Sequence, residues 1–337
     1  VVCKRAKYLE RTMNSLLAAP RDADKFPLVI SQDAHDPAMT RLVELEYVAK
    51  GLAHRIHHEH EANAEEMAKT FGKVKHTIGY VRIAQHFGFV MRKMFDSFGF
   101  EAVIFVEEDM EVAPDFFSYF GAMMPLLQQD KDLFCVSAWN DNGYGKMVLE
   151  PRRAYRTDFF PGLGWMVAKS FWGEIRDRWA VAYWDEFMRR RDVRRERKCI
   201  RPDVSRSYTF GSEGTSSGQF FKKHLSKIKL NDVVVDWQGL DLGYLSSTVA
   251  FDDFLAIQVR SAKRVSGPEE IEVLGPGGDT MRVRYESSEY KHIAKRFSLM
   301  EDEKEGIRRM SYRGVIPFAW GGRRVYLYTG EWPPNLD

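Results

Sequence analysis

The chain has 337 residues, of which 44% are hydrophobic and 29% charged, and its formal net charge is +2. This length exceeds the usual size of one hydrophobic core, so we expect a large domain and a smaller one. The small net charge argues against a polyanion binder or a membrane-surface binder, and no run of about 18 apolar residues is present to span a membrane.

The amino end reads "VVCKRAKYLERT", which predicts the tail of a first strand that runs directly into a helix. We therefore expect a further segment upstream, with a targeting or anchoring element in it. Cys3, Cys135 and Cys199 are too few for a disulfide framework, and without a CxxC pair they predict no zinc site. Their number alone favours the cytosol. Aromatic residues make up 13% of the chain, which suits a sugar-binding cleft and a large core equally well.

The first 130 residues alternate between strand and helix patterns. We expect strands at 26–33, within 54–60 and at 103–106, and helices at 7–18, 38–50, 74–98 and from Pro114 onward. The helix at 74–98 shows a 3.6-residue apolar period at Tyr80, Ala84, Phe87, Met91, Met94 and Phe98. This alternation predicts a mostly parallel sheet with helices on both faces.

Beyond residue 130 the pattern loosens. We expect a strand in "LFCVSAW" and a helix near 184–191. After about residue 250, "EEIEVLGPGGDTMRVRYES" and "GVIPFAWGGRRVYLYT" read as alternating strands around Gly-rich turns, with a short helix near 290–297 between them. This texture predicts a small α+β domain at the carboxyl end.

Acidic residues follow two of the predicted strands. "AVIFVEEDMEVAPD" ends a buried strand on Glu107, Glu108 and Asp109, and "SQD" ends an earlier strand on Asp33. Ligands of open α/β sheets bind at the carboxyl ends of strands, so the two clusters should face one cleft. Adjacent like charges repel, so a cation or solvent must stabilise them. A divalent metal with substrate phosphates would do so, as would a solvated acidic turn.

Three other segments carry candidate chemistry. "PGLGW" is a Gly-punctuated turn unlike GxGxxG, and "FGSEGTSSGQFF" is a Gly/Ser-rich segment that suits either phosphate binding or a surface loop. "YWDEFMRRR" places Asp185 and Glu186 at the start of a helix. A carboxylate there suits a general base, although acidic residues also favour a first helical turn because of the helix dipole.

Basic and histidine clusters have simpler interpretations. The run at 189–201 contains eight Lys or Arg residues, but acidic residues interrupt it, so we interpret it as a solvated helix face rather than a nucleic-acid site. The histidines of "HRIHHEH", which are His54, His57, His58 and His60, lack HExxH spacing and predict a surface turn rather than a metal site. Neither a GxSxG elbow nor a Walker loop is present.

In this order, "VVCKRAKYLERT", "FPLVISQD", "VEEDMEVAPDFFSYF", "SAWNDNG", "YRTDFFPGLGWM", "YWDEFMR", "RPDVSRSYTFG" and "GQFF" closely resemble the catalytic region of the N-acetylglucosaminyltransferase I family, glycosyltransferase family 13. The resemblance runs from residue 1 into the carboxyl-terminal part of the chain. It implies a GT-A type fold, a Rossmann-like mixed sheet with helices on both faces, at 1–250. A nucleotide-binding half at 1–130 and an acceptor half at 131–250 would precede a small α+β domain at 251–337.

The activity that this resemblance implies is inverting transfer of GlcNAc from UDP-GlcNAc to the 2-hydroxyl of the α1,3-linked mannose of Man5GlcNAc2. It implies manganese as cofactor, N-glycans of glycoproteins as partners, no nucleic acid, and the lumen of the Golgi. A full-length protein would be type II, held in the membrane by an amino-terminal anchor.

Residue roles carry over motif by motif. Asp109 would be the one direct protein ligand of manganese, and Asp185 the catalytic base. The donor would be bound by Arg5, Asp33, His86, Glu107, Glu108, Leu163, Trp184, Thr215 and Ser216. Glu108 would contact the ribose and Glu107 the donor sugar, while Leu163 and Trp184 would flank that sugar. Thr215 and Ser216 lie in the segment expected to close over the pyrophosphate.

Two positions depart from the family pattern. Glu108 stands where the usual signature has Asp, and Ala34 stands where the animal enzymes have a cysteine. Cys3 should therefore be unpaired, while Cys135 and Cys199 match a family disulfide. The sister activity toward O-linked mannose and a carbohydrate-binding relative without catalysis remain alternatives. Asp109 and Asp185, both present, argue against the second of these.

Overall fold

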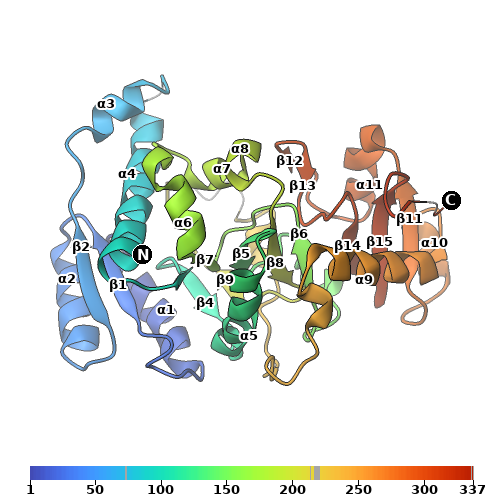
Figure 1. The fold of residues 1–337 in the computed structure, drawn as a ribbon, viewed down its shortest axis with the longest axis horizontal. Coiled ribbons are helices and arrows are strands. Elements are labelled where there is room, and N and C mark those ends of the chain that lie inside the picture. The colour runs from blue at the N-terminus through green and yellow to red at the C-terminus, as the bar shows by residue number, and fades with distance from the viewer. Residues whose placement is uncertain (73, 213, 216–220, 335, 337) are drawn as a thin grey trace.

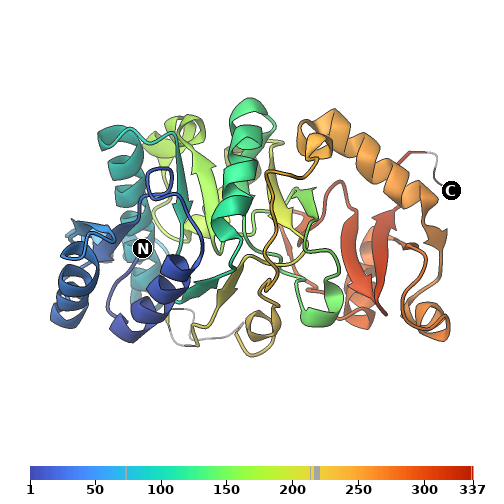
Figure 2. The same ribbon diagram turned by 90° about the horizontal axis from the view of Figure 1, so that it is seen from below.

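The structure is a computed structural model that describes residues 1–72, 74–212, 214–215, 221–334 and 336. The chain is arranged along the long axis of the molecule, with the amino-terminal elements toward one end and the carboxyl-terminal sheet at the other (Figures 1 and 2). The mixed α/β class expected from the sequence is confirmed.

A five-stranded mixed sheet forms the centre. Its order is β3 (Ala102–Phe105), β7 (Trp165–Ala168), β5 (Leu133–Ser137), β8 (Lys198–Pro202) and β6 (Ala154–Thr157). The pair β5 and β8 is parallel, whereas β7 runs antiparallel to β3 and β5, and β6 antiparallel to β8. The sheet is therefore mixed, and the expectation of a mostly parallel sheet is wrong for it. The acidic segment follows directly after β3.

Helices cover both faces of this sheet. Alternate residues of β7 point into two different hydrophobic cores. Met166 packs with α5 (Phe116–Gln129) and α1 (Ala6–Ala18). Val167, on the other face, packs with α4 (Val74–Met91) and α6 (Lys169–Ile175). This alternation is what the period-2 geometry of a buried strand requires. Expected helices at 7–18 and 74–98 are confirmed, the second continuing as a π-helical stretch, Arg92–Ser97.

The amino-terminal part contains a separate parallel pair of strands, β1 (Val29–Asp33) and β2 (His54–His58), in which Asp33 lies opposite His58. Between them α2 (Pro37–Leu42) runs into a π-helical stretch, Val43–Val48, and α3 (Ala64–Lys69) follows β2. Asp36 caps α2 by accepting a hydrogen bond from the Met39 N–H at 2.8 Å. Val2 forms a single parallel bridge with Gln32 of β1.

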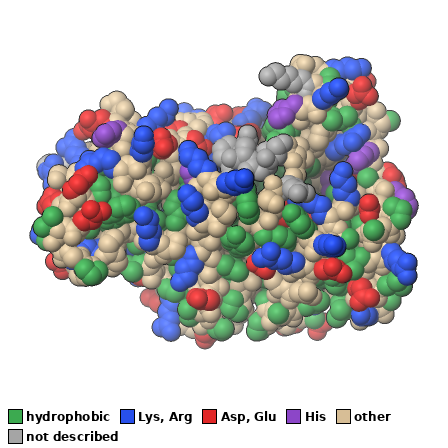
Figure 3. Space-filling view, turned by 180° about the vertical axis from the view of Figure 1, so that it is seen from behind, with side chains coloured by type: hydrophobic (Ala, Val, Ile, Leu, Met, Phe, Trp, Pro, Cys, Tyr) green, Lys and Arg blue, Asp and Glu red, His purple; other side chains and the backbone are tan. Residues whose placement is uncertain are grey.

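The middle of the chain corrects one expectation. The basic run is not one solvated helix face: it holds the end of α7 (Trp184–Arg189), then α8 (Arg191–Arg194) and strand β8. Arg194 and Arg201 are buried, although Arg190 and Arg191 are exposed as expected. Acidic and basic side chains are interspersed over the face in Figure 3, as the small net charge leads one to expect. A short antiparallel pair, β4 (Met110–Val112) and β9 (Ser207–Thr209), lies beside the central sheet.

The carboxyl-terminal part contains α9 (Thr248–Ser261) and a sheet of order β10 (Lys263–Arg264), β11 (Met281–Tyr285), β15 (Arg323–Thr329) and β14 (Ile316–Trp320). The expected hairpin and the helix α11 (Tyr290–Arg296) are confirmed. The expected strand in "EEIEV" is wrong: it is helix α10 (Pro268–Val273), which begins with Pro268 and two glutamates, as helix starts favour. A small hairpin, β12 (Glu303–Lys304) and β13 (Ile307–Arg308), and 3-10 turns at Gly145–Met147, Arg176–Arg178, Leu225–Lys227, Gly243–Leu245 and Ser287–Glu289 complete the fold.

The "SAWNDNG" segment connects the two parts. Trp139, Tyr144 and Met147 pack into the core of the carboxyl-terminal sheet, and Asp141 accepts hydrogen bonds from the Trp139 indole and from Arg309. The division at residue 250 stays a prediction.

Cysteine pairing agrees with the family resemblance. Cys135 and Cys199, which lie opposite each other on β5 and β8, form a disulfide, and Cys3 is free. Within the described residues, the helices are each too short or too polar to cross a membrane.

Candidate active site

The acidic segment after β3 is stabilised by one arginine. Arg5, just before α1, donates from Nε to Glu108 Oε1 at 2.6 Å and from Nη1 to Asp109 Oδ2 at 3.0 Å. The second oxygen of Glu108 accepts from the Cys3 backbone N–H, and Glu108 is buried. A cation of the chain thus neutralises part of the charge that the sequence places there.

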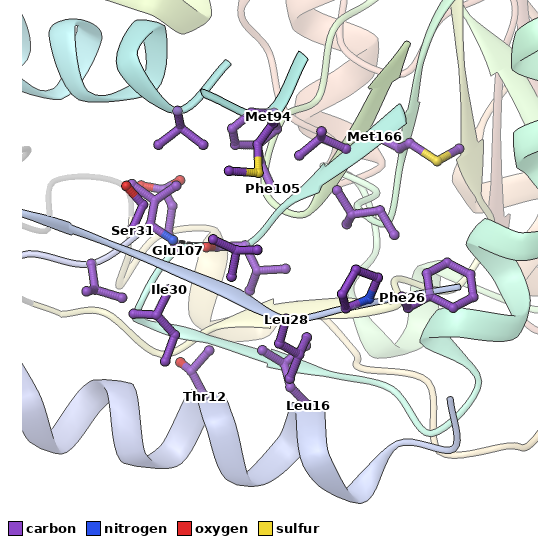
Figure 4. A pocket seen from close by; sticks show the side chains of 18 of the residues that line it. Thr12, Leu16, Phe26, Leu28, Ile30, Ser31, Met94, Phe105, Glu107 and Met166 are labelled. Atoms are coloured by element: carbon purple, nitrogen blue, oxygen red, sulfur yellow. Dashed lines mark hydrogen bonds between the residues drawn. The ribbon is translucent and has the colours of Figure 1, made fainter. Parts of the chain in front are cut away.

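Glu107 lies at the end of an apolar cavity of about 180 Å³ between β1 and β3 (Figure 4). Its walls include Ile30, Met94 and Phe105, and Ser31 lies beside Glu107. Burial raises the pKa of the Glu107 carboxyl to about 7, and the negative charges of Asp109 and Asp185 act in the same direction. Asp185 thus acts on Glu107 electrostatically, although less strongly than Asp109 does.

Asp33, at the carboxyl end of β1, is buried between two imidazoles. Its Oδ1 is 2.7 Å from His58 Nδ1, and its Oδ2 is 3.1 Å from His60 Nε2. Burial acts to raise the pKa of Asp33, but the His58 hydrogen bond and the nearby rings of His86 and His60 hold it below its ordinary value.

His86, on α4, completes this cluster. Its Nε2 lies 2.8 Å from Ser31 Oγ, and burial lowers the pKa of His86 to about 3, so the ring is neutral near pH 7. Residues Val2 and Cys3 separate the two acidic clusters: Asp33 N–H donates to Val2 O at 2.8 Å, and the Cys3 N–H binds Glu108. Asp33 and the acidic segment therefore lie on either side of one short stretch, and the expectation that they face one cleft stays a prediction.

The segment after β9 packs onto this site. A Cβ at Gly211 would lie 2.1 Å from Asp109 Oδ2, and one at Gly79 would lie 2.8 Å from the Thr215 methyl. Phe210 lies under the guanidinium of Arg11, 4.1 Å from its ring centre. The described residues of the segment thus pack closely on Asp109 and on α4, and Thr215 lies against Gly79 of α4. Ser216, the neighbouring donor-binding candidate, lies outside the described residues.

Helix α7 supplies Trp184 and Asp185. Trp184 is buried and stacks on Phe87 and Trp165, with ring centres 4.3 and 5.4 Å apart. Asp185 accepts a hydrogen bond from Arg189 Nη1 at 2.7 Å and keeps 42% of its side chain exposed. Stacking of Trp184 anchors the start of the helix, and Asp185, the next residue, is left open to solvent.

Leu163 lies in the "PGLGW" turn with a positive φ of 51°, between Gly162 and Gly164, which also have positive φ. Its carbonyl accepts a hydrogen bond from Ser207 Oγ at 2.6 Å. A Cβ at Gly164 would lie 3.1 Å from Ser207, so glycine permits this close approach. The turn holds Leu163 next to β9, which leads into the segment over Asp109.

Sequence reasoning missed His58 and His60. The prediction of a surface turn for "HRIHHEH" is wrong at His58, which is 5% exposed on strand β2 and contacts Asp33. The sequence indicated only that a short strand could lie here. The burial of His58 follows from the pairing of β2 with β1, which the local sequence does not reveal.

Asp109 is the residue whose chemistry fits a metal. Arg5 engages its Oδ2, and within the described residues Oδ1 has no hydrogen-bond partner. No group of three or more His, Cys, Asp or Glu side chains converges to form a metal cage among the described residues. A hard divalent cation often takes one carboxylate and completes its shell with substrate phosphates and water, so a single Asp109 oxygen suits that type of site.

Comparison with known proteins identifies a family and a relative to which the chain is similar. The model of the GNT-I family matches residues 1–333. The chain is 40% identical over 330 residues to the alpha-1,3-mannosyl-glycoprotein 2-beta-N-acetylglucosaminyltransferase of Arabidopsis thaliana, covering 97% of this chain and 72% of that protein.

Solved structures show weaker similarity. One is a mannosyltransferase from Pyrobaculum calidifontis in complex with GDP-Man and Mn2+, with a TM-score of 0.33, 16% identity, and coverage of 52% of this chain and 45% of that one. Another is TarS 1-349 of S. aureus, with a TM-score of 0.41, 12% identity, and coverage of 62% and 58%. At these scores the two structures support no conclusion about function.

Proposed function

The chain belongs to the GNT-I family, and we propose from this that it transfers GlcNAc from UDP-GlcNAc to the 2-hydroxyl of the α1,3-linked mannose of Man5GlcNAc2, with inversion. The product would be the first intermediate of hybrid and complex N-glycans. The observation that carries the proposal is the identity of 40% with a 2-beta-N-acetylglucosaminyltransferase over 97% of the chain.

The arrangement of the site supports this proposal. Acidic residues end β1 and β3 on either side of Val2 and Cys3, and Asp185 lies within electrostatic range of Glu107. A transferase needs donor-binding groups and a base at one place, because both substrates must meet there.

At the donor end, Asp33 and His86 would bind the uridine, Glu108 the ribose and Glu107 the sugar. Arg5 would contact the phosphates, with Thr215 and Ser216 over them, and Leu163 and Trp184 would flank the GlcNAc ring. Both oxygens of Glu108 already accept hydrogen bonds, from Arg5 and from the Cys3 N–H. A carboxylate offers about four acceptor positions, so Glu108 retains capacity for a ribose hydroxyl.

At the acceptor end, Asp185 would take the proton of the mannose 2-hydroxyl as its oxygen attacks the anomeric carbon from the face opposite UDP. The bond between the anomeric carbon and the phosphate oxygen breaks in the same step, and UDP leaves with its electron pair. Arg189 holds Asp185 in place through the 2.7 Å hydrogen bond. Gly211 packs closely against Asp109 and would thereby limit access of water to it.

Manganese would be held by Asp109 and, when bound, would supply positive charge to the diphosphate leaving group. Arg5 adds positive charge of its own beside Asp109. We further propose that the protein acts in the Golgi lumen. The Cys135–Cys199 disulfide supports an oxidising compartment, in contrast to what the number of cysteines alone favours.

An acceptor assay tests the proposal. The purified chain is given UDP-GlcNAc with Man5GlcNAc2 or with an O-mannosyl peptide, and products are identified by mass spectrometry and linkage analysis. We expect β1,2-linked GlcNAc on the N-glycan. Transfer to the peptide alone would establish the sister activity instead. Glycan binding without transfer under any metal condition would indicate a carbohydrate-binding relative.

A further inference from the structure

The Asp33 carboxylate is held by histidines on both sides. Its Oδ1 lies 2.7 Å from His58 Nδ1 and its Oδ2 lies 3.1 Å from His60 Nε2. The Asp33 side chain is only 7% exposed, and among the described residues no Lys or Arg forms an ion pair with it. A buried carboxylate without hydrogen bonds is strongly destabilising, so these two rings are what allows Asp33 to stay ionised there.

The position of His58 is itself fixed. Asp33 and His58 lie opposite each other in the β1–β2 pair, so their side chains point to the same face of that pair. The His58 ring stacks on His86, with ring centres 5.3 Å apart and planes 8° apart, and packs on Phe89 at 4.8 Å. These contacts and the two hydrogen bonds determine the plane in which the Asp33 oxygens lie.

We infer that His58 and His60 are positioning residues that orient the Asp33 carboxylate for selection of a uracil base. The inference rests on the proposed function, in which Asp33 helps to bind the uridine of the donor. An ionised carboxylate only accepts hydrogen bonds. Uracil presents an N–H at its N3 position, whereas cytosine presents a lone pair there. A carboxylate held in one plane therefore accepts a hydrogen bond from uracil N3–H and repels the lone pair of cytosine N3. If the carboxylate turns out of that plane, the selection of uracil over cytosine weakens.

Nucleotide competition measures this selection. The inhibition constants of UDP and CDP and the KM and kcat for UDP-GlcNAc are determined for the wild type, His58→Leu and His60→Leu. We expect each Leu variant to raise KM about tenfold, to leave kcat within about twofold, and to reduce the preference for UDP over CDP about tenfold, as loss of one charged hydrogen bond would do. His54→Ala, which removes an exposed histidine of the same strand, is the matched control and keeps the wild-type preference.

Conservative variants separate positioning from a structural role. The amide nitrogen of Asn replaces Nδ1 of histidine, and that of Gln replaces Nε2. His58→Asn and His60→Gln should therefore regain most of the UDP preference, whereas the exchanged pair, His58→Gln and His60→Asn, should not. If the Leu variants fail to fold, as seen by melting temperature, this amide comparison decides alone. Equal UDP-over-CDP preference in the matching and exchanged amide variants would overturn the inference.

The Asp33→Ala variant tests the donor-site assignment of Asp33 separately from the role of His58 and His60. If it loses the UDP preference while the histidine variants keep theirs, the donor-site assignment holds and the role of His58 and His60 is wrong. If it binds UDP as well as the wild type does, the donor-site assignment of Asp33 is wrong, and the inference falls with it.

Discussion

The Asp185 carboxylate accepts a hydrogen bond from Arg189 Nη1 at 2.7 Å, one turn further along α7. Arg189 is itself fixed, because its side chain is 8% exposed and its Nε donates to the Phe160 carbonyl at 3.2 Å. Glu186 also contacts Arg189, at 3.2 Å, but forms a second ion pair with Lys304 at 2.7 Å. The two neighbouring carboxylates are thus equally exposed and held by the same arginine. The negative charge of Asp185 also acts to raise the pKa of Glu107.

Comparison of Asp185 with Glu186 gives a direct test of the catalytic base. Asp185→Asn should lower kcat at least about a hundredfold, the usual contribution of a general base, because an amide takes up no proton. UDP-GlcNAc affinity, measured by calorimetry, should stay within about threefold, since Asp185 is expected to face the acceptor. The matched control Glu186→Gln should keep kcat within about twofold. Loss of activity in the control with retention in Asp185→Asn would transfer the role of base to Glu186.

The acidic strand ends could be predicted from the sequence, because an apolar strand and the charges that follow it form a pattern of only a few residues. Sequence reasoning left open whether a cation or solvent stabilises them, and it did not foresee that Arg5 binds both Glu108 and Asp109. The family resemblance assigned Arg5 to the donor. Contacts between residues about a hundred positions apart depend on how α1 packs beside β4, which no local pattern reports.

Two of the errors share one physical origin. His58 and Arg201 look like surface residues in sequence, yet His58 pairs with Asp33 and Arg201 lies in a strand of the central sheet. Polar residues can be buried when a distant partner satisfies them, and that partner is invisible to periodicity. At 268–273, by contrast, the alternating apolar pattern was compatible with strand and helix alike, and Pro268 with the acidic first turn favoured the helix.

Gly211 should be essential for the geometry of Asp109. A Cβ there would lie 2.1 Å from Asp109 Oδ2, so Gly211→Ala must displace the oxygen that Arg5 binds. We expect kcat/KM for UDP-GlcNAc to fall at least about tenfold, equivalent to about 1.4 kcal/mol, with little change in melting temperature. Gly173→Ala, where an added Cβ meets nothing within 4 Å, is the control and should be fully active. Normal kinetics in Gly211→Ala would mean that Asp109 can shift without consequence.

Metal removal tests the role of Asp109. Dialysis against EDTA should abolish transfer, and titration with Mn2+ should restore it. Asp109→Asn should need a manganese concentration at least about tenfold higher for half-maximal rate, because a neutral amide is a weaker ligand for a hard cation. Cys3→Ser, which leaves the carboxylates unchanged, should respond to Mn2+ as the wild type does. Full activity after complete metal removal, verified by elemental analysis, would contradict a metal-dependent mechanism.

The disulfide should contribute strongly to stability. Cys135 and Cys199 are 64 residues apart in sequence, and closing such a loop in the unfolded chain is worth about 4 kcal/mol. The double variant Cys135→Ala, Cys199→Ala should lose a comparable free energy of unfolding in urea titrations, whereas Cys3→Ala should lose less than about 1 kcal/mol because Cys3 is half-buried and unpaired. A non-reducing peptide map should show the linked pair. Two free thiols in lumenally expressed protein would count against the bond.

His86 should make the stability depend on pH. Burial lowers the pKa of His86 from 6.5 to about 3, so between these values the unfolded chain binds a proton that the folded chain does not. Stability therefore falls as the pH drops below 6.5, by about 1.4 kcal/mol per pH unit from this residue. Asp33, whose pKa is also lowered, contributes stability that is complete above its unfolded value of 3.8 and is lost only at lower pH.

His86→Gln isolates this effect, because the Gln amide replaces Nε2 beside Ser31 but takes up no proton. From urea titrations at pH 7.0 and pH 5.0, the wild type should lose about 2 kcal/mol more than the variant over this interval. The exposed His54, changed to Gln, should leave the wild-type dependence unchanged. An identical loss in His86→Gln and the wild type would mean that His86 takes up its proton within the folded protein.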